Sequence, residues 1–127
     1  MPSHPNLATS LNLPRLYAIV DAGVCAEAGR TPIEVARAFL SAGVTCLQLR
    51  AKTWDSGPFL EWAAAVTADA AGVGAMVIIN DRSDVALLAN AAGVHVGQGD
   101  LAPADARCVV GPIAIVSFQM SDGAGTR

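Results

Sequence analysis

Three polar side chains alternate with apolar ones at the end of a stretch that otherwise has the character of a buried strand. Gln48, Arg50 and Lys52 follow the apolar residues that begin after Thr45, and we call them the clamp residues. Side chains of a β-strand repeat with a period of two, so all three leave the same face of the backbone. Arginine forks onto phosphate oxygens and lysine acts as a point charge, which is typical of a clamp for a phosphorylated ligand. An edge strand with a solvated polar face is the structural alternative.

Polar residues also follow the other predicted strands, each time on the carboxyl side of the strand. They are Asn80, Asp81 and Arg82 after residues 75–79, Gln98 and Asp100 after residues 93–96, and Ser117 after residues 113–116. Ligands of parallel α/β folds bind at the carboxyl ends of the strands. Because the amino ends of these strands carry no comparable cluster, the sequence predicts a small-molecule site at the carboxyl face.

Two of these polar residues, Asp81 and Asp100, are carboxylates at separate strand ends. Mg²⁺ prefers oxygen ligands and is held by one or two carboxylates together with substrate phosphate. With the clamp residues, the pair indicates a magnesium-bound diphosphate rather than an acid/base couple. The alternative is that each aspartate caps the helix that follows it. We expect His95, inside an apolar strand, to be a core histidine.

Apolar runs and helix signals alternate along the whole chain. Predicted strands cover residues 16–20, 45–49, 75–79, 93–96 and 113–116, and predicted helices cover residues 31–43, 58–71, 84–91 and 103–109. The first helix has the clearest start, because Thr31 can cap it, Pro32 suits the first turn and Glu34 completes a capping box. Ser83 is expected to cap the helix over residues 84–91. Short βα connections predict a parallel sheet with right-handed crossovers.

The composition fits one α/β domain. Of 127 residues, 53% are hydrophobic and 15% charged, which is enough to build a packed core. A net charge of −3 without a basic run argues against nucleic-acid binding. Three scattered cysteines indicate reduced thiols in the cytoplasm, and no segment approaches the ~20 apolar residues of a membrane helix. Residues 1–14 are expected to form a flexible leader.

Three motifs, in this order and in this strand context, resemble the signatures of thiamine phosphate synthase, a family of the TenI-like superfamily. They are Gln48–Lys52, Ile79–Ala86 and Gly93–Leu101, and the runs Leu16–Asp21 and Ile115–Ser117 fit in the same order. The resemblance covers residues 15–117 and implies a (β/α)₈ barrel. It also implies that the family joins hydroxymethylpyrimidine diphosphate to thiazole phosphate, giving thiamine phosphate and diphosphate.

The resemblance also implies roles for individual residues. The pyrimidine diphosphate would be held by Gln48, Leu49, Arg50, Ala51, Lys52, Asn80 and Ser117. Arg50, Lys52 and Ser117 are the expected catalytic residues, and Asp81 and Asp100 would coordinate Mg²⁺. The family reaction resembles a dissociative substitution, in which diphosphate leaves and the thiazole nitrogen traps a pyrimidine carbocation. Cations would stabilise the departing diphosphate, so no protein nucleophile is needed.

The chain departs from the family after its fifth strand. A complete barrel needs eight βα units and about 200 residues or more, so we expect a partial barrel of about five units with parallel strands. Residues 118–127 form a tail unlike the family, as expected of a truncated or frameshifted product. We therefore expect impaired or absent activity, and self-association through exposed sheet edges.

Two other interpretations fit parts of the pattern. A non-catalytic, flavodoxin-like domain that binds a small molecule would have the strand order 2-1-3-4-5 instead of 1-2-3-4-5. A thiazole tautomerase-like relative would share the layout, but such proteins typically lack the Asn80-Asp81 pair and the Gly-Gln-x-Asp motif of residues 97–100.

Overall fold

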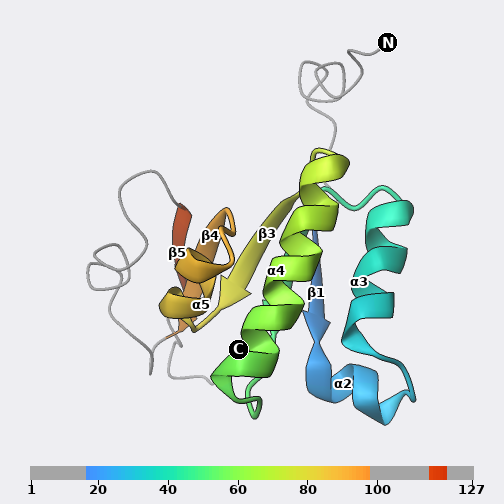
Figure 1. The fold of residues 1–127 in the computed structure, drawn as a ribbon, viewed down its shortest axis with the longest axis horizontal. Coiled ribbons are helices and arrows are strands. Elements are labelled where there is room, and N and C mark those ends of the chain that lie inside the picture. The colour runs from blue at the N-terminus through green and yellow to red at the C-terminus, as the bar shows by residue number, and fades with distance from the viewer. Residues whose placement is uncertain (1–16, 98–114, 120–127) are drawn as a thin grey trace.

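In the computed structural model, a parallel sheet carries its helices on one face (Figure 1). The structure describes residues 17–97 and 115–119. The elements are β1 (Tyr17–Asp21), α2 (Ala22–Glu27), α3 (Pro32–Ser41), β2 (Cys46–Arg50), α4 (Ser56–Gly72), β3 (Met76–Asn80), α5 (Ser83–Leu88), β4 (Gly93–Gly97) and β5 (Ile115–Gln119). None of these helices combines the length and the apolar character that crossing a membrane requires.

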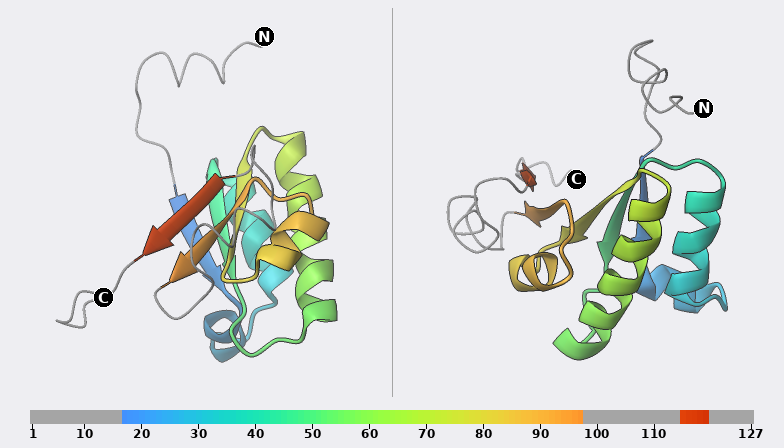
Figure 2. Two further views of the ribbon diagram at one scale, coloured as in Figure 1. Left: turned by 90° about the vertical axis from the view of Figure 1, so that its left-hand side faces the viewer. Right: turned by 45° about the horizontal axis from the view of Figure 1, so that its top comes forward.

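The strands lie in the order β1-β2-β3-β4-β5, and every neighbouring pair is parallel. The sheet curls as it passes from β1 to β5 (Figure 2). A flavodoxin-like sheet would place β1 between β2 and β3, so that alternative is wrong. The prediction of a partial (β/α)₈ barrel with five parallel strands is confirmed.

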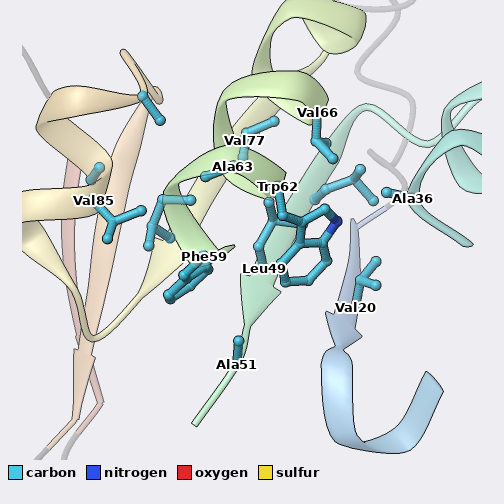
Figure 3. Close-up of a cluster of buried hydrophobic side chains, with 14 of the residues drawn as sticks. Val20, Ala36, Leu49, Ala51, Phe59, Trp62, Ala63, Val66, Val77 and Val85 are labelled. Carbon is cyan, nitrogen blue, oxygen red and sulfur yellow. The ribbon is translucent and has the colours of Figure 1, made fainter. Parts of the chain in front are cut away.

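The hydrophobic core lies between the sheet and its helices, as Figure 3 shows. Leu47 and Leu49 of β2 are fully buried there and face the helix layer. Phe59, Trp62 and Val66 of α4 cover them from the other side. Burial of each large side chain contributes about 1.5–3 kcal/mol. Because side chains alternate along β2, Gln48 between the two leucines lies on the opposite face.

The predicted start of α3 is confirmed. The Glu34 amide donates to Thr31 Oγ1 over 3.3 Å, and the Thr31 amide donates to Glu34 Oε1 over 2.8 Å. The two contacts form a complete capping box, with Pro32 in the first turn.

The predicted cap of α5 is wrong. Arg82 occupies the N-cap position, and no side chain caps the helix. Ser83 is instead the first residue of α5, and its Oγ is buried without a hydrogen bond to the described residues. A small side chain such as that of serine fits this buried position. The serine therefore marked the start of the helix, but the predicted first residue was one position too late.

The sequence analysis missed α2. The residue that could have indicated this helix is its N-cap, Asp21, whose Oδ1 accepts hydrogen bonds from the amides of Gly23 at 2.8 Å and Val24 at 3.1 Å. Six residues are too few to display a helical period. Strand β5 ends at Gln119, later than the predicted residues 113–116, while the predicted helix over residues 103–109 and the leader over residues 1–14 lie outside the described residues.

Candidate functional site

The sheet register brings the predicted polar residues to one edge of the molecule. Asp21 of β1 pairs with Arg50 of β2, and Asn80 of β3 pairs with His95 of β4. His95 in turn pairs with Ser117 of β5, which places Ser117 by register at the same edge. All of these positions lie at or near the carboxyl ends of their strands, where parallel α/β proteins bind ligands.

A chain of hydrogen bonds crosses the first three strands at Gln48. Asn80 Nδ2 donates to Gln48 Oε1 over 3.1 Å, and Gln48 Nε2 donates to the Tyr17 hydroxyl. Gln48 is only 5% exposed and Asn80 is also buried, so these bonds replace the water that both amides lose. The chain fixes the rotamer of each amide, which is what a recognition site for a polar ring requires.

Tyr17 was not among the predicted site residues. It is the only tyrosine of the chain, and it stands two residues before Ile19 on the same face of β1. The residue type and its period along β1 were available signals. Its partner Gln48 lies 31 residues away, so the contact itself could not be foreseen from local spacing.

Arg50 is held by a partner that the sequence analysis also left unassigned. Its Nε lies 3.0 Å from Asp21 Oδ2, with side-chain exposures of 41% for Arg50 and 28% for Asp21. Asp21 uses its other oxygen to cap α2. The pair orients the guanidinium through Nε, and the terminal Nη groups retain donors that suit a phosphate.

A small pocket joins the loops that follow β2 and β3. Its lining includes Lys52, Trp54, Asn80, Asp81 and Arg82. The structure thus brings the lysine of the clamp beside the Asn80-Asp81 pair, although 28 residues or more separate them in the sequence. Cationic, amide and carboxylate groups around one pocket suit a phosphorylated ligand and its counter-ion.

Two residues of the predicted binding motif face elsewhere. The Leu49 side chain is 0% exposed and belongs to the helix-side core, on the opposite face of β2 from Gln48. Ala51 also packs in that core, although it borders the pocket. A ligand on the clamp face could therefore reach Leu49 only through its main chain.

Asp81 occupies a sharp turn at the end of β3. Its φ angle is +73°, a left-handed conformation that is uncommon outside glycine. Its amide donates to the His95 carbonyl over 2.7 Å, and the Arg82 amide donates to the Asn80 carbonyl over 2.8 Å. Such a conformation costs about 1–3 kcal/mol and persists where the surroundings hold it, most often at functional sites.

The chemistry of Asp81 fits magnesium, although the described residues supply only part of a metal site. Within residues 17–97 and 115–119, no group of three or more histidine, cysteine or acidic side chains could hold a metal ion. The second predicted ligand, Asp100, lies outside the described residues. One hard carboxylate beside the pocket agrees with an ion that takes its remaining ligands from a diphosphate and water.

The described cysteines play no part in this pocket. Cys25 and Cys46 are buried, and neither forms a disulfide with another described residue. Burial raises the pKa of the Cys25 thiol, and the nearby Asp21 carboxylate adds to the rise. A thiol with a raised pKa is a poor nucleophile at neutral pH, in agreement with chemistry that does not require one.

Comparison with known proteins identifies relatives of the whole described fold. The family model described as "Thiamine monophosphate synthase" matches residues 16–123. The chain is 39% identical over 108 residues to a thiamine-phosphate synthase of Solidesulfovibrio magneticus, covering 85% of this chain and 50% of that relative. It is 41% identical over 101 residues to a probable thiamine biosynthetic bifunctional enzyme, chloroplastic, of Oryza sativa subsp. japonica, covering 80% of this chain and 18% of that protein.

A solved structure gives the same result. The thiamine phosphate pyrophosphorylase from Pyrococcus furiosus superposes with a TM-score of 0.73 at 26% sequence identity, covering 82% of this chain and 48% of that one. The chain thus spans about half the length of the Solidesulfovibrio magneticus relative and of the Pyrococcus furiosus protein. The family match extends past Ser117 into the segment 118–127, so the division of the chain at residue 117 stays a prediction.

Proposed function

Because this chain belongs to the thiamine monophosphate synthase family, we propose that it carries the pyrimidine diphosphate half of a thiamine phosphate synthase site. The observation that carries the proposal is the meeting of the Gln48–Asn80 amide pair with Lys52 and Asp81 at one end of the sheet. These groups come from two separate strand ends, and each matches one part of the ligand. The amides suit the polar ring, and the cations suit the diphosphate.

The proposed reaction transfers a pyrimidinylmethyl group. The bond between the methylene carbon and the diphosphate oxygen breaks, and its electron pair leaves with the diphosphate. The lone pair of the thiazole nitrogen then forms the new carbon–nitrogen bond. Arg50 and Lys52 would bind the diphosphate more strongly as negative charge accumulates on it, which lowers the barrier.

Several further assignments belong to this proposal. Asp81 and Asp100 would hold Mg²⁺, which when bound neutralises charge on the diphosphate. Ser117 would approach the pyrimidine, since its register position lies beside His95 at the same sheet edge. Buried cysteines without a disulfide among the described residues support a reducing compartment, and we propose a cytoplasmic location.

We further propose that this chain binds one substrate but turns over little or none of it. The 127-residue chain spans about half the length of two of the relatives compared above, so the proposal of little or no turnover applies to this chain tested on its own. Among the described residues β1 and β5 are the outer strands of the sheet, and we propose that the chain self-associates through these edges. Appreciable production of thiamine phosphate by the purified 127-residue chain with both substrates and Mg²⁺ would contradict this.

The decisive experiment is titration calorimetry of the pyrimidine diphosphate with and without Mg²⁺. We expect binding that Mg²⁺ strengthens, and we expect Asp81→Asn to abolish that strengthening. Asp69→Asn is a matched control, because Asp69 pairs with Arg37 between α3 and α4, away from the pocket. Magnesium-independent binding, or equal losses in both variants, would contradict the proposal.

A further inference from the structure

The turn at Asp81 needs support from outside itself. Two main-chain hydrogen bonds accompany the turn, within two residues of the end of β3. The Asp81 amide donates to the His95 carbonyl, and the Arg82 amide donates to the Asn80 carbonyl. A bond from residue i+2 to residue i around a positive φ defines a rare and strained three-residue turn. The helix that follows, α5, has no side-chain cap to anchor its start. The His95 carbonyl of β4 holds the Asp81 amide on one side of the turn, and a second contact lies on the side of α5.

The Arg82 side chain supplies that contact. Its Nε donates to Asp84 Oδ1 over 3.1 Å and its Nη2 donates to Asp84 Oδ2 over 2.8 Å, which forms a two-pronged fork. The same Nη2 donates to Ser56 Oγ over 2.6 Å. Ser56 is the first residue of α4, whereas Asp84 lies in the first turn of α5. One guanidinium thus links the starts of two helices.

Arg82 borders the pocket, yet the edge of its guanidinium formed by Nε and Nη2 is already engaged. A carboxylate takes the fork that could otherwise meet a phosphate. The hydrogen bond to Asp84 raises the pKa of Arg82, and the same bond holds the pKa of Asp84 below its ordinary value. The pair is therefore charged on both sides at neutral pH. Its geometry suits a fixed brace better than a group that must receive substrate.

We propose that Arg82 is a positioning residue, which braces α5 against α4 and thereby holds the Asp81 turn with Asn80 and Asp81 facing the ligand. The inference rests on the function proposed above. Arg82 would touch neither the diphosphate nor the metal ion. Its effect on binding would pass through the main chain at Asp81.

The test combines amide hydrogen exchange with calorimetry on the full chain. Arg82→Met should speed exchange of the Asp81 amide about tenfold, because the local opening becomes easier. It should also weaken the Mg²⁺-dependent binding of the pyrimidine diphosphate about tenfold, as loss of a contact behind a metal ligand typically does. Arg82→Lys should fall between, since lysine lacks the planar fork. The control Arg37→Met, which removes the comparable pair with Asp69, should change neither quantity.

The exchange measurement decides the inference whether or not the ligand binds. An unchanged Asp81 amide in folded Arg82→Met would overturn the brace. So would a loss of binding that is equal with and without Mg²⁺ and leaves exchange unaltered, since that pattern marks a direct phosphate contact. Faster exchange of the Asp81 amide in Arg82→Met, together with no binding of the pyrimidine diphosphate by the unsubstituted chain, would support the brace and contradict the proposed function. If Arg82→Met does not fold, Ser56→Ala removes one arm alone and should speed the same amide by a smaller factor.

Discussion

On β2, Leu47 and Leu49 face the helix layer, while Gln48 between them faces the other way and meets Tyr17 and Asn80. The two leucines and Gln48 are all buried, but different forces keep them there. The leucines gain by leaving water, so any apolar side chain of similar size would serve. Gln48 gains only if each of its polar groups finds a partner. The helix-side face therefore tolerates exchange among apolar side chains of similar size, whereas the other face depends on particular polar partners, which the proposed site would use to select its ligand.

The contrast extends to neighbouring elements. Phe59 and Trp62 of α4 pack with ring centroids 6.0 Å apart and close the helix-side core. On the other face of the sheet, Tyr17 is 53% exposed and Ile19 is exposed to a similar degree. Exposure of these large side chains to water contributes no hydrophobic stabilisation. Their exposure is consistent with a face that a ligand or a further chain covers.

The largest predicted effect tests the helix-side face. Phe59→Ala should lower the free energy of unfolding by about 3–5 kcal/mol, because it removes a fully buried ring and leaves a cavity. Urea denaturation followed by circular dichroism measures the loss. Leu88→Ala is the control, since Leu88 is exposed on α5 and should change stability by no more than about 0.5 kcal/mol. Similar losses in both variants would break the comparison.

The second prediction tests the other face. Gln48→Met keeps the volume but leaves the Asn80 amide and the Tyr17 hydroxyl without their shared partner, which should cost about 1–3 kcal/mol of stability. Diphosphate binding should weaken as well. Leu47→Met, a similar exchange on the helix side, should cost less than about 1.5 kcal/mol and leave binding intact. A larger stability loss in Leu47→Met than in Gln48→Met would contradict the division of roles.

Much of the fold could be predicted from local sequence patterns. Alternation in β2 predicted correctly that Gln48 lies on the face opposite Leu47 and Leu49, and the capping box at Thr31 located the start of α3. Lys52 follows the end of β2, so its place on the same face stays a prediction. The parallel direction of the strands followed from the short βα connections, but these connections left the strand order open between 1-2-3-4-5 and 2-1-3-4-5 until the structure gave it. These signals act over a few residues, where period and residue type determine the geometry.

Partners distant in the sequence could not be predicted in this way. Nothing in the spacing of Arg82 indicates that its guanidinium contacts Ser56, 26 residues earlier. The pairing of Asp21 with Arg50 depends likewise on the register of β1 against β2. Ser83 had the residue type of a cap, yet packing buried it as the first residue of α5 instead. Tertiary packing overrides local preference where a residue meets another element.

The third prediction separates binding from stability at Arg50. Arg50→Met should weaken diphosphate binding about tenfold, because a charge-assisted contact to phosphate is lost. The free energy of unfolding should fall by less than about 1 kcal/mol, since the pair with Asp21 is partly exposed to solvent. Calorimetry and urea denaturation on the same samples measure both quantities. A stability loss larger than the loss of binding free energy would assign Arg50 to the scaffold instead.

The smallest predicted effect concerns acid and the two helix starts. The hydrogen bond from Arg82 lowers the pKa of Asp84, whose ordinary value is 3.8, and the capping box lowers the pKa of Glu34 from 4.5. A carboxyl whose pKa is lower in the folded state stabilises the fold above its ordinary pKa. That contribution disappears as the pH falls through the lowered value. Stability should therefore decline below about pH 4.5, with a contribution from Asp84 of less than about 1 kcal/mol because its side chain is mostly exposed.

Two variants assign this decline to its sources. Asp84→Asn should remove the part that begins near pH 3.8, and Arg82→Met should remove most of it, because Arg82 is the largest cause of the lowered pKa, ahead of the backbone amides of Val85 and Asp84. Glu34→Gln should instead remove the part that begins near pH 4.5 and leave the Asp84 contribution in place. Urea midpoints between pH 3 and pH 7 measure all three. An Asp84 contribution that is undiminished in Arg82→Met would mean that the backbone amides at the start of α5, and not Arg82, hold the Asp84 carboxylate in its charged form.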